Sequence, residues 1–263
     1  MSEPPALAFH HLSKRFGGVL ALDDVELTVE RGEVHGLLGE NGSGKSTLIK
    51  VLAGRHAPSA GAELELGGRR VRLPLRPGEP RALGICFVHQ DLALLPSLTV
   101  ADNLRLEELA GSRSMRLSRV RERAQAREDL GRLGAALDPR LVVSELSSAE
   151  RARLAIARAL TSLARHRPGL LVLDEPTSFL PETERRALLE LIRGLTESGS
   201  SVLLVSHDVE EARDVCDRIT VLRNGCGAGT VASARVGAQE LMGMILGRRP
   251  RPAAAPRISG NLS

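Results

Sequence analysis

The chain has 263 residues, 42% of them hydrophobic and 26% charged, as is ordinary for a soluble globular protein of one large or two small domains. No apolar run approaches the roughly 18 residues of a membrane span, and residues 1–8 lack the features of a signal peptide, so we expect a cytoplasmic protein. The cysteines Cys86, Cys216 and Cys226 are scattered and lack C-x-x-C spacing, which favours free thiols over disulfides or a metal site.

The formal net charge of +4 is concentrated at the C-terminal end of the sequence. Residues 247–263 contain Arg248, Arg249, Arg251 and Arg257 and no acidic residue, so residues 1–246 are formally neutral. We expect residues 248–263 to form a basic, Pro/Ala-rich, disordered tail. A neutral folded part argues against nucleic acid as a partner, and contact of the tail with anionic lipid head groups or RNA is the alternative that stays open.

Short apolar stretches predict strands on both sides of a glycine-rich loop in the first third of the chain. These strands lie at Leu7–Phe9, Val25–Val29, Val34–Leu38 and Ala62–Leu66, and another follows at Gly84–His89. From Pro96 to about Ala164 the pattern turns helical. The apolar positions thus predict a strand-rich first segment followed by a helical one.

Two uninterrupted apolar runs, Leu170–Leu173 and Val202–Val205, are typical of strands that are buried on both faces of a parallel sheet. Pro181–Thr196 is the predicted crossover helix between them, and a last short helix is expected around Leu241 and Ile245. The sequence therefore predicts an α/β protein. Its core comprises about residues 6–95 and 165–235, and a helical subdomain of about residues 96–164 is inserted between them.

The most informative motif is the glycine loop that follows the predicted strand Val34–Leu38. Its residues fit the pattern G-x-x-x-x-G-K-[ST], and they are Gly39, Glu40, Asn41, Gly42, Ser43, Gly44, Lys45, Ser46 and Thr47. The glycines let the backbone turn its amide N–H groups inward, where they bind phosphate oxygens at a helix N-terminus. Lys45 adds a charge for the outer phosphates, and the Ser46 hydroxyl suits Mg²⁺. The loop predicts a purine nucleoside triphosphate as the ligand.

A pair of acidic residues, Asp174 and Glu175, follows the apolar run Leu170–Leu173. In open parallel sheets, ligands bind at the carboxyl ends of the strands, so both side chains should face the phosphates. We expect Asp174 to hold the Mg²⁺ shell and Glu175 to orient or deprotonate the water that attacks the γ-phosphate. Taken alone, an Asp-Glu pair is more simply a helix N-cap, and its combination with the glycine loop favours the catalytic interpretation.

Five motifs occur in one order along the chain. They are the glycine loop, Gln90 in Val88-His89-Gln90-Asp91, Leu146-Ser147 before Arg151–Leu160, Asp174-Glu175-Pro176-Thr177, and His207 in Val205-Ser206-His207-Asp208. Together they resemble the ATP-binding cassette of ABC transporters over about residues 6–247. The stretch Gly36–Lys50 looks most like cassettes of ribose, xylose and galactose importers. The resemblance implies one cassette over residues 1–247, with a P-loop NTPase α/β core, a mainly parallel sheet, an N-terminal antiparallel β portion and an inserted α-helical subdomain.

The resemblance also implies roles for single residues. Phe16 matches the aromatic residue that stacks on adenine, with a core phenylalanine as the alternative. Gln90 would contact Mg²⁺ or the attacking water and relay the nucleotide state to a membrane partner. His207 would contact the γ-phosphate and position Glu175 and the water. The alternatives for these two are a surface glutamine and a structural histidine.

The chain departs from the family at two places. The signature Leu-Ser-Gly-Gly-Gln, which in the family binds the γ-phosphate held by the opposite subunit, reads here as Leu146, Ser147, Ser148, Ala149 and Glu150. Ser147 still offers a hydroxyl, but the side chains at 148 and 149 crowd a close backbone approach and Glu150 adds like charge near phosphate. In addition, Pro181 stands where the family has an interface aspartate. Both changes lie on the surface that is offered to a partner.

The sequence thus leads us to expect an ATPase subunit of an ABC importer for a monosaccharide, using ATP and Mg²⁺ and lying on the inner face of the cell membrane. The implied partners are a second cassette, integral membrane permease subunits and, indirectly, an extracytoplasmic sugar-binding protein. The altered signature suggests asymmetry, with hydrolysis at this glycine loop only when the partner offers an intact signature. One alternative is a regulatory cassette with little hydrolysis. Another is a non-transport ABC ATPase, which would need a basic surface on the folded part.

Overall fold

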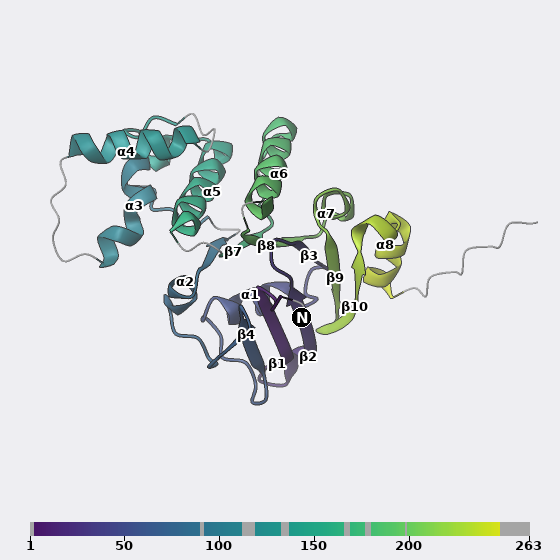
Figure 1. Ribbon diagram of the computed structural model, residues 1–263. Helices are drawn as coiled ribbons and strands as arrows, with labels where there is room; N and C mark the ends of the chain where they lie inside the picture. Colours follow the sequence, from purple (N-terminus) through teal and green to yellow (C-terminus); the bar gives the residue numbers. More distant parts are fainter. Residues whose placement is uncertain are drawn as a thin grey trace, which may run out of the picture.

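The computed structural model describes residues 3–89, 92–111, 119–132, 137–165, 169–176, 180–197 and 199–247. A six-stranded sheet with the order β10-β9-β3-β8-β7-β6 forms its centre (Figure 1). The strands are β3 (Val34–Leu38), β6 (Ile85–Val88), β7 (Leu170–Asp174), β8 (Ser201–Ser206), β9 (Arg218–Arg223) and β10 (Cys226–Ala232). All neighbours run parallel except β10, which is antiparallel to β9. The parallel strands therefore end at one common edge.

Both faces of this sheet are buried, which explains its uninterrupted apolar strands. In β7, Leu171 and Leu173 belong to the apolar cluster on one face, while Leu170 and Val172 belong to the cluster on the other. The first face is covered by α5 (Ser148–Ala164), α6 (Glu182–Glu197), α7 (Val209–Val215) and α8 (Ala238–Leu246). The second face is covered by α1 (Lys45–Leu52) and by a smaller sheet. Helix α6 begins and ends within one residue of the predicted crossover helix.

The smaller sheet contains β1 (Leu7–Phe16), β2 (Val19–Val29), β4 (Glu63–Leu66) and β5 (Arg69–Val71), in the order β2-β1-β4-β5. All its neighbouring strands are antiparallel, as expected for the N-terminal portion. The predicted strands at its start were too short, because β1 and β2 continue as a hairpin with one exposed face. There the polar residues of the outer face interrupt the apolar runs.

The helical segment comprises α3 (Val100–Gly111), α4 (Arg119–Arg132), the 3₁₀ turn η1 (Val143–Glu145) and α5. These helices share an apolar cluster that includes Val100, Leu130 and Leu154, and α5 joins them to the central sheet. In Figure 1 they lie at one end of the sheet, away from β1 and β2. The remaining short elements are α2 (Glu79–Ala82) and η2 (Ser233–Arg235).

Three further expectations concern a membrane span, the C-terminal tail and the cysteines. Within the described ranges, no helix combines the length and apolarity needed to cross a membrane. The basic tail expected at residues 248–263 lies outside the described residues. The three cysteines are free thiols, and burial raises the pKa of the Cys216 thiol.

Candidate active site

The site is built at the carboxyl ends of β3, β8 and β7. The register places Leu38 of β3 opposite Ser206 of β8, and Val205 opposite Asp174 of β7. The residues that follow these strands are the glycine loop, His207 and Glu175. Three segments that are far apart in the sequence therefore meet at one edge, where ligands of parallel sheets bind.

The backbone of the glycine loop requires glycine at two positions. Gly44 has a φ of 109°, and a Cβ there would lie 2.7 Å from Leu22 Cδ2 and 2.8 Å from the Ala21 carbonyl oxygen. A Cβ at Gly39 would lie 2.3 Å from the carbonyl oxygen of Leu222. The loop is thus packed against β2 and β9, and side chains at these positions would displace it.

Lys45 is only 6% exposed, and its side chain is hydrogen-bonded to the backbone of the loop. Its Nζ donates hydrogen bonds to the carbonyl oxygens of Gly39 at 2.6 Å and Glu40 at 3.0 Å. Burial lowers the pKa of Lys45, and the nearby carboxylates of Glu175 and Asp174 oppose that effect. The ammonium group is therefore placed between the loop and the acidic pair, where a triphosphate would need it.

Glu175 and His207 face each other across neighbouring strand ends. His207 Nδ1 lies 3.3 Å from Glu175 Oε1, and the glutamate side chain is 18% exposed. Glu175 has a φ of 51°, and its N–H donates to the Val205 carbonyl oxygen at 3.0 Å. A left-handed glutamate is strained, and such backbone outliers cluster at functional sites. The turn therefore aims the carboxylate toward the histidine.

The chemistry of these residues fits a magnesium nucleotide. The Ser43 hydroxyl is buried and has no hydrogen-bond partner among the described residues, so a polar group is left for a ligand. A hollow opens at the start of the loop, lined by Gly39, Glu40, Asn41 and His207 and by apolar residues of α8. The Ser46 hydroxyl and the Asp174 carboxylate are the hard oxygen donors that Mg²⁺ prefers.

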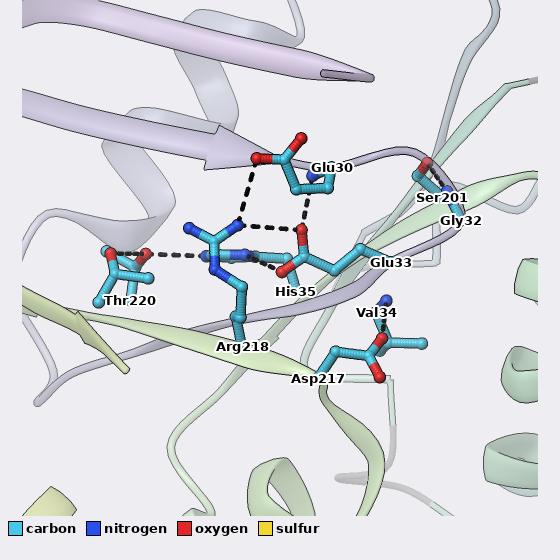
Figure 2. Close-up of polar contacts among 10 residues, drawn as sticks. Glu30, Gly32, Glu33, Val34, His35, Ser201, Asp217, Arg218 and Thr220 are labelled. Carbon is cyan, nitrogen blue, oxygen red and sulfur yellow. Dashed lines mark hydrogen bonds and ion pairs between the residues drawn. The ribbon is translucent and has the colours of Figure 1, made fainter. Parts of the chain in front are cut away.

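A partly buried polar network anchors β3, the strand that leads into the glycine loop (Figure 2). His35 is fully buried, with Nδ1 2.8 Å from Glu33 Oε1 and Nε2 2.8 Å from the Thr220 hydroxyl of β9. Glu33 also accepts from Arg218 Nη1 at 3.3 Å, and Asp217 accepts from the Val34 N–H at 2.8 Å. The sequence carried one signal of this network, His35, the single polar residue of the predicted strand Val34–Leu38, and that signal was not enough to predict it.

The network also sets the ionisation of Glu33. Burial, the largest effect, would raise the pKa of this carboxyl group, yet the pKa lies below its ordinary value. The opposing effects are the hydrogen bond and charge of His35, the Glu30 N–H and the Arg218 guanidinium. Glu33 is therefore held as a carboxylate that joins β3 to β9.

Phe16 lies at the end of β1, beside the hairpin turn. It is 42% exposed, which rules out the core interpretation. Its ring packs edge-on against His56, with 5.1 Å between centroids, and Lys14 Nζ lies 4.8 Å from the ring centre. Part of the ring surface thus stays exposed to solvent, beside a cation and a histidine.

The signature segment stands at the start of α5. Ser147 is the N-cap of this helix, and Glu150 completes a capping box with it. Helix α5 packs on α3, α4, β6 and β7, so the segment belongs to the helical part of the chain. Gln90 lies outside the described residues, as do residues 177–179 before Pro181.

Comparison with known proteins gives consistent matches. A family model described as "ABC transporter" matches residues 22–178. The "Ribose import ATP-binding protein RbsA 1" of Rubrobacter xylanophilus is 45% identical over 248 residues, which are 93% of this chain and 47% of that protein. "RbsA 3" of Rhizobium meliloti is 42% identical over 237 residues, covering 90% of this chain and 45% of that protein. The chain thus spans about half the length of the curated relatives it matches.

Solved structures share the fold. The ATP-binding cassette MJ0796, in a dimeric post-hydrolysis state bound to ADP and Pi, superposes with a TM-score of 0.73 at 26% identity, covering 86% of this chain and 98% of that one. The cassette MJ1267 in its ADP conformation also has a TM-score of 0.73, at 24% identity, covering 92% of this chain and 95% of that one. The predicted fold class is therefore confirmed.

Proposed function

Because the chain belongs to the ABC transporter family, as its motifs predicted, we propose that it is the ATP-hydrolysing subunit of an importer. The observation that carries the proposal is the convergence of the glycine loop, Glu175 and His207 at one sheet edge. Phosphoryl transfer to water needs a phosphate cradle, a metal site and a group that positions the water. The ribose-import names of the relatives support a monosaccharide as the cargo.

In this proposal the glycine loop holds the triphosphate. Its N–H groups and the Ser43 hydroxyl bind phosphate oxygens, and Lys45 exchanges its two carbonyl contacts for the outer phosphates. Ser46, Gln90 and Asp174 would hold Mg²⁺. When bound, the ion neutralises charge that develops on the phosphate oxygens.

Glu175 is the proposed general base. Its carboxylate would accept a proton from the attacking water as the bond from water oxygen to the γ-phosphorus forms and the bond to the leaving ADP oxygen breaks. His207 would hold Glu175 through Nδ1, which leaves Nε2 free to contact the γ-phosphate. The partly exposed ring of Phe16 would stack on the adenine ring.

The partner surfaces follow from the same assignment. A second cassette would cover the glycine loop with its own signature segment, and the pair would drive a separate membrane permease from the inner face of the membrane. The dimeric state of the structural relative MJ0796 supports such pairing. The altered residues Ser148, Ala149 and Glu150 would be offered to the partner's nucleotide, so the two sites of the dimer would differ in turnover.

A regulatory cassette, which binds ATP and scarcely hydrolyses it, is the second candidate. It is favoured by the contact of Glu150 with Ser147, which occupies the hydroxyl that a partner's phosphate would need. The contact of Glu175 with His207 in this chain's own site favours hydrolysis instead.

The substitution Glu175→Gln separates the two candidates. It removes the base while keeping the size of the side chain, so phosphate release by the chain assembled with its partner and permease should fall by about 100- to 10,000-fold with ATP binding retained. Unchanged turnover would contradict the role of Glu175. Tight ATP binding by the unaltered chain without phosphate release, even in the assembly, would favour the regulatory cassette.

A further inference from the structure

Two of the three register shifts in the β1–β2 hairpin lie next to each other, one on each strand. The register shifts first where His10 and His11 of β1 stand opposite the single residue Glu26 of β2. It shifts again after the next residue pair, where Asp24 and one further residue of β2 stand opposite the single residue Ser13 of β1. Each is a β-bulge, a feature that re-aims side chains. One bulge on each strand turns residues toward a shared point on the outer face of the sheet.

The backbone at this point is left-handed on both strands. His11 has a φ of 54° and Asp24 a φ of 48°, and neither is glycine. The Asp24 N–H donates to the Ser13 hydroxyl at 2.9 Å, which fixes this turn. As a result, the side chains of His11 and Asp24 meet, with Nδ1 2.9 Å from Oδ1.

Glu26 completes a compact set of ligand atoms. Its Oε1 lies 3.8 Å from His11 Nδ1, and one donor atom from each of His11, Asp24 and Glu26 lies within 4.8 Å of the other two. The Glu26 carboxylate is itself held, because Oε1 accepts the His11 N–H at 2.7 Å and Oε2 lies 2.7 Å from His10 Nδ1. Partners of this kind orient the ligands of a metal ion.

We propose that His11, Asp24 and Glu26 bind a divalent transition-metal ion such as Zn²⁺, with His10 as a positioning residue. An imidazole nitrogen beside two carboxylates suits Zn²⁺, Co²⁺ or Ni²⁺, whereas Mg²⁺ and Ca²⁺ prefer all-oxygen sites. Two carboxylates balance the charge of a divalent ion, and the exposure of all three side chains leaves access for the ion and for a water ligand. The ion would replace the proton between His11 and Asp24 and join the two bulges.

The proposal does not depend on the proposed ATPase function, and it is tested by metal binding alone. Isothermal titration of the full chain with Zn²⁺, in excess Mg²⁺, should show one equivalent bound. His11→Asn and Asp24→Asn both keep residues that tolerate left-handed backbone, so the fold is retained while binding should weaken at least about tenfold. Co²⁺ should give the visible absorption of a low-coordinate nitrogen and oxygen site in the unaltered chain and lose it in both variants.

His207→Ala is the matched control, because His207 with Glu175 is another imidazole and carboxylate pair that could hold Zn²⁺. It should leave Zn²⁺ binding unchanged. Loss of binding in His207→Ala, or unaltered binding in His11→Asn and Asp24→Asn, would overturn the proposal. Equal affinity for Ca²⁺ would overturn the assignment of the metal class. Glu26→Gln should also weaken binding, which keeps the test open if one of the other variants misfolds.

Discussion

Glu150 closes a hydrogen-bonded ring on Ser147 at the start of α5. Its Oε2 accepts from both the N–H and the hydroxyl of Ser147, each at 2.8 Å, and its own N–H donates to that hydroxyl at 3.2 Å. The backbone hydrogen bond from Ser147, followed by that from the Ser147 hydroxyl, lowers the pKa of the Glu150 carboxyl group. A carboxylate thus sits on the two Ser147 donors that, in our proposal, would face the partner's nucleotide.

We therefore expect Glu150→Gln to raise ATP turnover of the assembled dimer by about two- to fivefold, since it removes one like charge beside phosphate at a helix N-terminus. Glutamine still completes a capping box, so α5 should keep its stability. Glu145→Gln, the same change at an exposed residue five positions earlier, is the control and should have no effect. Phosphate-release rates that are equal in both variants would contradict this role of Glu150.

Lys45→Met should abolish ATP binding. In the unaltered chain, a 100-fold excess of MgATP over its dissociation constant should add about 2.7 kcal/mol to the free energy of unfolding. The variant should gain nothing, because the charge that faces the phosphates is lost. Lys50→Met changes an exposed lysine on the same helix and should retain the gain. Denaturant unfolding with and without MgATP measures both, and retained stabilisation in Lys45→Met would refute the prediction.

The 3.3 Å contact of Glu175 with His207 predicts energetic coupling in catalysis. Glu175→Gln and His207→Ala should each slow turnover strongly, and the double variant should be about as slow as the slower single one, because both act through one group. Single-turnover phosphate release under saturating MgATP gives the comparison. Independent, multiplicative losses would mean that His207 does not act through Glu175.

Gly44→Ala should destabilise the chain more than Gly42→Ala does. Both residues have positive φ values, 109° and 83°, so each variant carries a left-handed penalty of about 1–2 kcal/mol. Only at Gly44 does the new Cβ also meet other atoms within 4 Å, among them the Ala21 carbonyl oxygen at 2.8 Å. We expect an additional loss of about 1–3 kcal/mol in the free energy of unfolding. If urea denaturation gave equal losses in the free energy of unfolding for the two variants, the loop would be able to move away from β2 with little loss of stability.

Acid should weaken the link between β3 and β9. The folded-state pKa of Glu33 lies below the ordinary value of 4.5, so its stabilising contribution is complete above that value and is lost as the pH falls through the lower, folded-state pKa. Glu33→Gln should therefore flatten the fall in stability below about pH 5. Unfolding free energies measured from pH 6 to about pH 3 test this, with Glu240→Gln on α8 as the exposed control. Parallel pH profiles for Glu33→Gln and the unaltered chain would exclude the effect.

The sequence by itself determined the fold class and the position of the glycine loop and the acidic pair at strand ends. The apolar runs of β7 and β8 identified buried parallel strands, since burial on both faces leaves no polar position. The glycine loop and the acidic pair could be placed at strand ends, because their chemistry depends on short local segments. Family resemblance then linked His207 to Glu175 across 32 positions of sequence, a distance that local patterns do not span.

Tertiary structure alone decided the rest, because the deciding contacts join segments that no sequence period relates. Burial of His35 is tolerated only since Glu33 and Thr220 satisfy both ring nitrogens, and Thr220 arrives from β9. The two bulges that bring His11 to Asp24 depend on the pairing of β1 with β2. Glu150 was expected to repel phosphate, and the structure adds that its carboxylate already occupies Ser147. Unlike the other two, this contact is local, because Ser147 and Glu150 form the S-x-x-E capping box at the start of α5.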